Sequence, residues 1–186
     1  MNLTLARPVA AVIPLALLAA SACSKPAAPP APSGGTTAVE SATLGVKLTE
    51  LPEGFSNPRE LGGALELLAD LNGTRGTVTL RILERPGGVS LVEEVKGFGA
   101  SASAAGGTFY GGNELVTPYG AAYTARAAVD NGTAEERRVF LLHPDGSQRL
   151  LVVNLHYPPG DAEVARGRLQ QMLALLAALE PLTPAS

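Results

Sequence analysis

His143 and His156, the two histidines of the chain, are with Asp145 and Asp161 the first residues whose types could do chemistry. Imidazole and carboxylate groups bind zinc and act as general acids or bases. His143 falls at one end of an expected hairpin that turns at Asp145 and Gly146, whereas His156 falls toward the far end of the return strand. Because a structural metal requires four close ligands, this spacing argues against a shared site. We expect both histidines at strand ends on a solvated surface, and no metal or other cofactor.

Two further stretches fall short of catalytic motifs. The glycine-rich residues 106–113 lack the Lys-Ser or Lys-Thr of a phosphate-binding P-loop, so a flexible turn or an exposed binding loop is expected there. Residues 99–103 do not match the Gly-x-Ser-x-Gly nucleophile elbow, and only the distant histidines could supply a base. Adjacent charged side chains diverge on a strand or a helix, which predicts solvated surface for the remaining pairs. These pairs are Glu93-Glu94, Glu135-Glu136 and Arg137-Arg138. No catalytic residue is predicted.

The composition excludes several classes of protein. Hydrophobic residues make up 46% of the chain and charged residues 17%, which is enough apolar material for one folded core. Aromatic residues make up only 4% and tryptophan is absent, so stacking platforms for sugars or bases are not expected. The net charge is −3, and without Arg7 of the first 22 residues it is −3 − 1 = −4. A nucleic-acid partner is excluded, because such binders present a basic stripe to the phosphates.

The first 22 residues have the layout of a signal peptide. Arg7 precedes a short apolar run from Val9 to Ala20, and small residues precede Cys23. Cys23 is the single cysteine of the chain, so no intrachain disulfide can form, and an exposed thiol in an oxidising compartment requires an occupant. We expect the leader to be removed.

Residues 20–23, Ala-Ser-Ala-Cys, resemble the lipobox of bacterial lipoproteins, although Ala20 stands where leucine is preferred. The resemblance implies lipidation of Cys23 and stable anchoring of the chain at a membrane of the cell envelope. Ser24, where aspartate would signal inner-membrane retention, favours the outer membrane with the domain in the periplasm. An ordinary secretory leader cut after Ala22, or a retained core cysteine, is the alternative.

The remaining chain divides by composition. Residues 23–43 begin with the lipidated cysteine and form a tether rich in proline, alanine and glycine, which favours an extended spacer over a core. A proline-rich ligand for a partner domain is the alternative for this segment. One α+β domain is expected over residues 44–181, followed by a tail at residues 182–186.

Apolar periodicity predicts the elements of this domain. Residues 64–71 and 77–84 form a hairpin around Asn72-Gly73. Ser90 caps a helix to about Ala105, with a buried stripe of Val92, Val95 and Phe98. Three strands follow, at residues 121–129, 137–143 and 149–157, the last two turning at Asp145-Gly146. Asp161 caps an amphipathic helix to about Leu179, and Glu180-Pro181 ends it.

The layout resembles the PsbP-like α+β fold, an antiparallel sheet packed with a middle helix and a C-terminal amphipathic helix. The resemblance covers residues 44–181, and residues 120–126 and 137–179 carry it. It implies a domain that binds or assists assemblies without catalysis. Together with the expected anchor, the spacer and the lack of catalytic motifs, this predicts a non-catalytic binding or assembly module with an envelope protein as partner. Two alternatives remain open: capture of a small molecule or lipid between sheet and helix, for which residues 99–112 could leave room, and an enzyme of unrecognised type.

Overall fold

The computed structural model describes residues 38–85 and 88–182. The predicted leader, Cys23 and most of the predicted tether lie outside these residues. The described part is a mixed α+β structure with two antiparallel sheets and two helices, so the expected fold class is confirmed at this level. The small sheet has the strand order β1-β2-β10. Its strands are β1 (Val39–Ser41), β2 (Val46–Leu48) and β10 (Leu179–Pro181).

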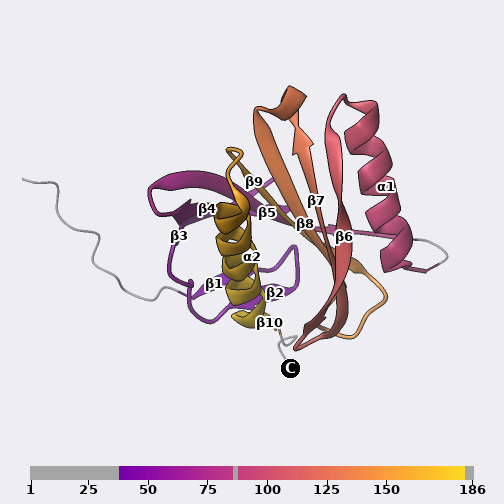
Figure 1. Ribbon diagram of the computed structural model, residues 1–186. Helices are drawn as coiled ribbons and strands as arrows, with labels where there is room; N and C mark the ends of the chain where they lie inside the picture. Colours follow the sequence, from indigo (N-terminus) through magenta and orange to yellow (C-terminus); the bar gives the residue numbers. More distant parts are fainter. Residues whose placement is uncertain (1–37, 86–87, 183–186) are drawn as a thin grey trace, which may run out of the picture. The chain divides into compact units, whose positions relative to one another are not determined.

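The large sheet has seven strands in the order β3-β4-β5-β9-β8-β7-β6, all antiparallel (Figure 1). Its strands are β3 (Phe55–Leu61), β4 (Ala64–Leu71), β5 (Thr74–Leu83), β6 (Thr108–Thr117), β7 (Gly120–Val129), β8 (Ala134–Leu142) and β9 (Leu150–Tyr157). The two helices are α1 (Leu91–Ala104) and α2 (Ala162–Ala177).

The predicted hairpins are confirmed where their turn chemistry was clear. Asn72 and Gly73 connect β4 to β5 with φ of 52° and 80°, the positive values that an Asn-Gly hairpin turn requires. Gly146, with φ of 78°, lies in the turn between β8 and β9. Most residues of β8 and β9 are buried, on both faces of the sheet, which suits the apolar runs at residues 139–142 and 150–153.

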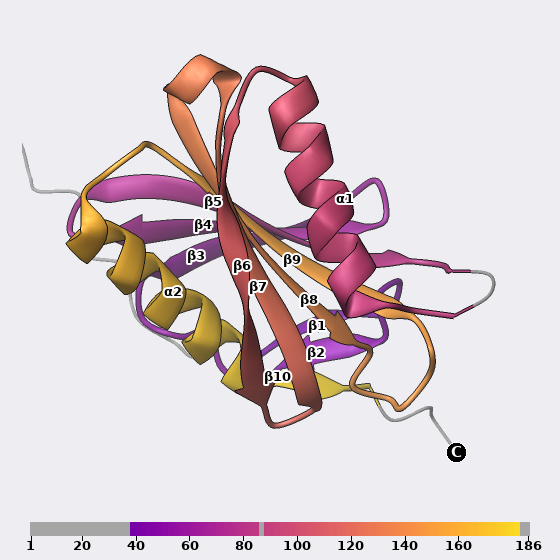
Figure 2. The ribbon, with the colours of Figure 1, turned by 45° about the vertical axis from the view of Figure 1, so that its right-hand side comes forward.

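The two helices pack on opposite faces of the large sheet (Figure 2). Val139 and Val153 belong to the core cluster on the α2 face, whereas Phe140 and Val152 belong to the cluster on the α1 face. Neighbouring residues of one strand point to opposite faces, so this alternation divides the apolar residues of β8 and β9 between two cores. The small sheet contributes Val46 to the α2-side cluster.

Both predicted helix starts are confirmed. Ser90 caps α1 by accepting a hydrogen bond from the Glu93 amide, and Asp161 caps α2 by accepting from the amides of Glu163 and Val164. The predicted stripe of α1 is partly wrong, because Val92 is 43% exposed while Phe98 is buried.

Three strands differ from the predictions. Residues 55–61, for which no strand was predicted, form edge strand β3, and its pairing with β4 shifts between Ser56 and Arg59, as the missing amide hydrogen of Pro58 favours. The expected loop at residues 106–113 contains the first half of edge strand β6, with a register shift before Gly111. Its polar, glycine-rich sequence hides the strand period. The last expected helical turn is instead β10, since α2 ends at Ala177.

Strand β1 lies within residues 23–43, the segment predicted as tether. Its partner β2 also pairs with β10, Leu179 lying opposite Leu48. Among the described helices, neither is long and apolar enough to cross a membrane.

Candidate functional site

Helix α1 covers only part of its face of the large sheet. It packs on β6, β7 and β8, and leaves the neighbouring strands β9 and β5 without a helix above them. Several side chains of these strands that point to the α1 face are polar, including Thr79, Arg81 and Asn154. The strand pairing places them on this face, because Arg81 lies opposite Val152 and Asn154 lies opposite Arg138. A polar surface beside an apolar helix contact is therefore built into the sheet.

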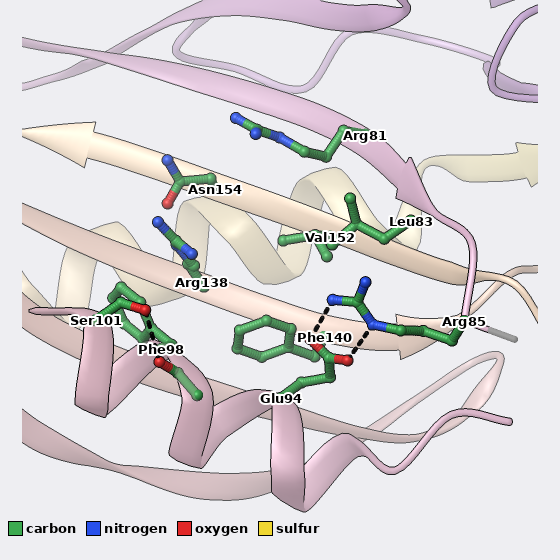
Figure 3. A pocket seen from close by; sticks show the side chains of 11 residues that line it. Arg81, Leu83, Arg85, Glu94, Phe98, Ser101, Arg138, Phe140, Val152 and Asn154 are labelled. Atoms are coloured by element: carbon green, nitrogen blue, oxygen red, sulfur yellow. Dashed lines mark hydrogen bonds and ion pairs between the residues drawn. The ribbon is translucent and has the colours of Figure 1, made fainter. Parts of the chain in front are cut away.

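A groove of about 290 Å³ runs between α1 and this surface (Figure 3). Four apolar side chains, three guanidinium groups and one carboxylate contribute to its walls. The side chains that line it are Arg81, Leu83, Arg85, Glu94, Phe98, Ser101, Arg138, Phe140, Val152 and Asn154, together with the backbone of Gly97. A second hollow of about 390 Å³ adjoins it and shares Phe98, Ser101 and Arg138.

Arg85 and Glu94 join the end of β5 to α1 at one end of the groove. The Arg85 guanidinium makes a two-pronged contact, with Nη2 donating to Glu94 Oε2 at 2.8 Å and Nε donating to Oε1. The hydrogen bonds from Arg85 hold the pKa of Glu94 below its ordinary value. This ion pair closes one end of the groove, and Glu94 neutralises the positive charge of Arg85.

Arg138 lies at the centre of the groove. Its guanidinium carbon is 4.2 Å from the centroid of the Phe98 ring, and Nη2 donates to Glu136 Oε2 at 2.8 Å. Phe98 is 4% exposed and contacts Phe140 with a centroid distance of 6.5 Å, so the ring beneath the cation is held in place. The guanidinium is thus presented on a rigid apolar floor.

Arg81 and Asn154 have unused hydrogen-bonding capacity. In the described part of the chain, Arg81 makes no ion pair or side-chain hydrogen bond, and its side chain is exposed. The Asn154 Oδ1 atom is buried without a hydrogen-bond partner, and Asn154 lies directly opposite Arg138 in the sheet. Figure 3 shows Arg81, Asn154 and Arg138 on the same side of the sheet as α1. The guanidinium groups of Arg81 and Arg138 can donate hydrogen bonds to a carboxylate, whereas Asn154 Oδ1 can only accept one from an N–H or O–H group of the same ligand.

The groove has no arrangement suited to covalent catalysis among the residues described. Its hydroxyl nucleophile, Ser101, donates to the backbone oxygen of Gly97 at 2.9 Å and not to a base. Within residues 38–85 and 88–182, no group of three or more histidine, cysteine, aspartate or glutamate residues could hold a metal ion. The arrangement suits recognition of a ligand.

The two histidines lie on opposite faces of the sheet and do not form one site. The side chain of His156 is 43% exposed. Its Nδ1 lies 3.7 Å from Glu136 Oε1 and its Nε2 lies 3.9 Å from Asp130 Oδ2. His143 is 2% exposed, so the prediction of a solvated surface is wrong for it. Its Nε2 lies 2.7 Å from Leu44 O and its Nδ1 lies 2.7 Å from Asp145 Oδ1, which ties the β8–β9 turn to the small sheet.

The other predicted residues are dispersed. Asp161 is a helix cap, and the adjacent carboxylates Glu93 and Glu94 diverge, Glu93 pairing with Lys96 at 2.7 Å. Glu135 and Arg137 are buried, so the prediction of solvated surface is wrong for both, while Cys23 lies outside the described residues.

Sequence reasoning did not identify the groove. Asn154 interrupts the apolar run of β9, whereas Arg81 fits the polar half of the alternation in β5 and Arg138 follows three other charged residues in β8. A polar residue inside an otherwise apolar central strand is the signal that could have identified this face, because burial of such a group requires a reason.

No protein-family model matches the chain, and no curated protein sequence matches it significantly. Among solved structures, a mutant of the protein Mog1 superposes with a TM-score of 0.55 at 12% identity, covering 81% of this chain and 97% of that one. The Saccharomyces cerevisiae Ran-binding protein Mog1p gives 0.55 at 11% identity, covering 80% and 96%. A STAR-related lipid transfer protein from Xanthomonas axonopodis reaches only 0.28, which is too low to support a shared fold. The chain therefore has the fold of the Mog1 structures, and identity this low establishes the fold alone.

Proposed function

We propose that this chain is a bacterial lipoprotein that acts as a non-catalytic binding module of the cell envelope and holds an acidic segment of a partner protein in the groove beside α1. Lipid on Cys23 would anchor it, and the outer membrane with the domain in the periplasm is the favoured location. The unpaired Arg81 beside Arg138 is the observation that carries this proposal. In a chain of net negative charge, these guanidinium groups form a local site for a carboxylate.

Three further features support a binding role. The groove has an apolar floor for the body of a peptide, formed by Leu83, Phe140 and Val152, with cations above it. The Mog1p structure with the same fold is named as a Ran-binding protein, so this fold serves protein recognition elsewhere. The resemblance of the chain to the PsbP-like fold points the same way.

The test places a photoreactive amino acid at Ser101, which lines the groove, in the full-length protein expressed in its host. We expect a covalent adduct with one envelope protein. The same amino acid at Ala177, an exposed position at the end of α2, is the matched control and should give no such adduct. Adding Arg81→Glu should abolish the adduct, whereas Arg166→Glu, the same change of charge on exposed α2, should leave it unchanged.

The crosslinked segment of the partner is then synthesised as a peptide with its acidic residues and with their amide counterparts. The acidic peptide should bind wild type at least about tenfold more tightly than the amide form, since a charge-assisted pair contributes about 1.5–3 kcal/mol. Equal binding of the two peptides, or an adduct insensitive to Arg81→Glu, would refute recognition of an acidic segment.

Anchoring is tested separately. Labelled palmitate should enter the wild-type protein and not a Cys23→Ser variant, and only wild type should sediment with membranes. Label in both proteins or in neither would contradict lipidation at Cys23, without bearing on the groove.

Capture of a small amphiphilic anion is a second candidate function. The four apolar side chains of the groove, Leu83, Phe98, Phe140 and Val152, favour it, because a free guanidinium above an apolar floor also suits such a ligand. Native mass spectrometry of protein purified from its host should then show a retained mass that Arg81→Glu removes. Repeated bare masses would argue against this candidate.

A further inference from the structure

A separate cavity lies on the face of the large sheet opposite the groove beside α1, near the edge formed by β6, β7 and β8. It measures about 210 Å³ and is lined by Tyr110, Gly111, Asn113, Thr124, Ala125, Arg126 and Arg137. None of these residues lines the groove beside α1. The register shift before Gly111, whose φ is 102°, interrupts the ladder of β6 with β7 where the cavity forms. A β-bulge of this kind redirects side chains at the edge of a sheet.

Two buried polar atoms on residues that line this cavity have no partner in the described part of the chain. Thr124 is 2% exposed, and its Oγ1 atom makes no hydrogen bond. Arg137 is 8% exposed, and its Nε atom also makes none, although Nη2 donates to Ala165 O at 3.2 Å. Leaving a buried donor unpaired is costly, and the cost is larger for a charged group. The unpaired atoms therefore indicate a missing hydrogen-bond acceptor.

The charges around the cavity favour an anion. Arg126 and Arg137 are neighbours across β7 and β8, and two guanidinium groups this close repel each other unless an anion lies near. Glu135 supplies one negative charge, with its Oε2 4.0 Å from Arg126 Nη1. That carboxylate also accepts a hydrogen bond from the Tyr157 hydroxyl at 2.9 Å. One positive charge remains in excess.

The cavity has further groups for an anion. Asn113 contributes an amide side chain, and the Arg126 guanidinium carbon lies 4.5 Å from the centroid of the Tyr110 ring. The ring limits the positions open to Arg126, which reduces the entropy lost when a ligand binds. We propose that this cavity binds a small oxyanion, with Arg137, Arg126 and Thr124 as the donors. The same chemistry would accept inorganic phosphate or a carboxylate.

The test titrates the purified full-length protein, in neutral detergent, with sodium phosphate and in parallel with sodium acetate, replacing sodium chloride at constant ionic strength. Arginine Nε resonances are followed by NMR, and affinity is measured by calorimetry. We expect saturable binding of one of the two anions and a shift of the Arg137 Nε resonance. Saturation by phosphate identifies a phosphate site, and saturation by acetate alone identifies a carboxylate site.

Two variants decide the result. Thr124→Val keeps the shape of the side chain and should weaken binding about five- to tenfold, because one hydrogen bond to an anion is lost. Thr79→Val makes the same change at a side chain on the opposite face of the sheet, so this control should bind the anion like wild type. Arg126→Gln, at a more exposed position, should weaken binding further. This second variant keeps the test decisive if Thr124→Val does not fold. Responses to both anions no larger than the response to chloride, or wild-type binding by both Thr124→Val and Arg126→Gln, would overturn the proposal.

Discussion

The guanidinium carbon of Arg138 lies 4.2 Å from the centroid of the Phe98 ring, which joins the centre of the large sheet to the buried side of α1. The same guanidinium also donates to Glu136 through Nε and Nη2. A planar cation that stacks on a ring and pairs with a carboxylate has little freedom to rotate. The position of α1 and the direction of this charge are therefore coupled.

Replacing Arg138 with lysine tests this coupling. The change keeps the charge but loses the planar group, so we expect about three- to tenfold weaker binding of the acidic partner peptide, with the free energy of unfolding within about 1 kcal/mol of wild type. Calorimetry and urea denaturation measure the two quantities. Arg166→Lys on exposed α2 is the control. Unchanged affinity in Arg138→Lys would show that only charge matters.

Asp145 should make stability depend on pH. Burial alone would raise its pKa, but hydrogen bonds from Ser147, His143 and Arg149 outweigh burial and hold the pKa below its ordinary value. A depressed pKa in the folded state stabilises the protein above the unfolded-state pKa of about 3.9, and this contribution is lost as the pH falls below it. Because the side chain is 34% exposed, we expect no more than about 1 kcal/mol.

The variant Asp145→Asn, which keeps the oxygen that accepts from the Ser147 amide, should therefore be less stable than wild type at pH 7 and should converge with it toward pH 2. Thermal denaturation across this range measures the difference, and Glu50→Gln at an exposed carboxylate is the control. A difference that stays constant with pH would contradict the assignment.

Tyr157 donates to the buried carboxylate of Glu135, and burial raises the pKa of Tyr157 to about 12, so its hydroxyl remains a donor at neutral pH. We expect Tyr157→Phe to lower the free energy of unfolding by about 1–3 kcal/mol, because a buried carboxylate loses a hydrogen bond. Urea denaturation measures the loss. Tyr123→Phe, whose hydroxyl makes no hydrogen bond within the described residues, should change stability by less than about 0.5 kcal/mol.

Two glycines of α1 should respond to alanine in opposite directions. A Cβ atom at Gly97 would meet nothing within 4 Å, so Gly97→Ala should stabilise the protein by about 0.5–1 kcal/mol through helix propensity. At Gly99 the same atom would lie 2.9 Å from Phe109 Cδ1, and the ring would have to move. We expect Gly99→Ala to destabilise by about 1–3 kcal/mol. Thermal denaturation of both variants measures the signs, and equal signs would contradict this packing.

The sequence predicted elements whose signals are local. Asn72-Gly73, Ser90 and Asp161 define turns and caps through their own backbone preferences, and the structure contains each. Edge strands β3 and β6 were missed, since one unpaired side and little burial leave no strict alternation of apolar residues.

The groove could not be predicted for a different reason. Arg81, Asn154 and Glu94 come from two strands and a helix, and only the strand order β5-β9-β8 brings them together. Single-sequence patterns carry no signal for such non-local pairing. The buried cluster around Glu135 and Arg137 was missed because adjacent charged residues are typical of a protein surface. Successive residues of a strand point to opposite faces of the sheet, so Glu135 and Arg137 are buried on one face while Glu136 and Arg138 point to the other.

The pairing of β2 with β10 has a consequence for biogenesis. Strand β10 comes from the last described residues of the chain and β2 from near the first, so the small sheet lacks one strand until synthesis has reached residue 181. A chain exported from its N-terminal end would expose the apolar side chains of Val46 and Leu48 throughout transit. Because this pairing joins residues from the two ends of the described chain, its loop-closure entropy makes completion of the small sheet a late step of folding.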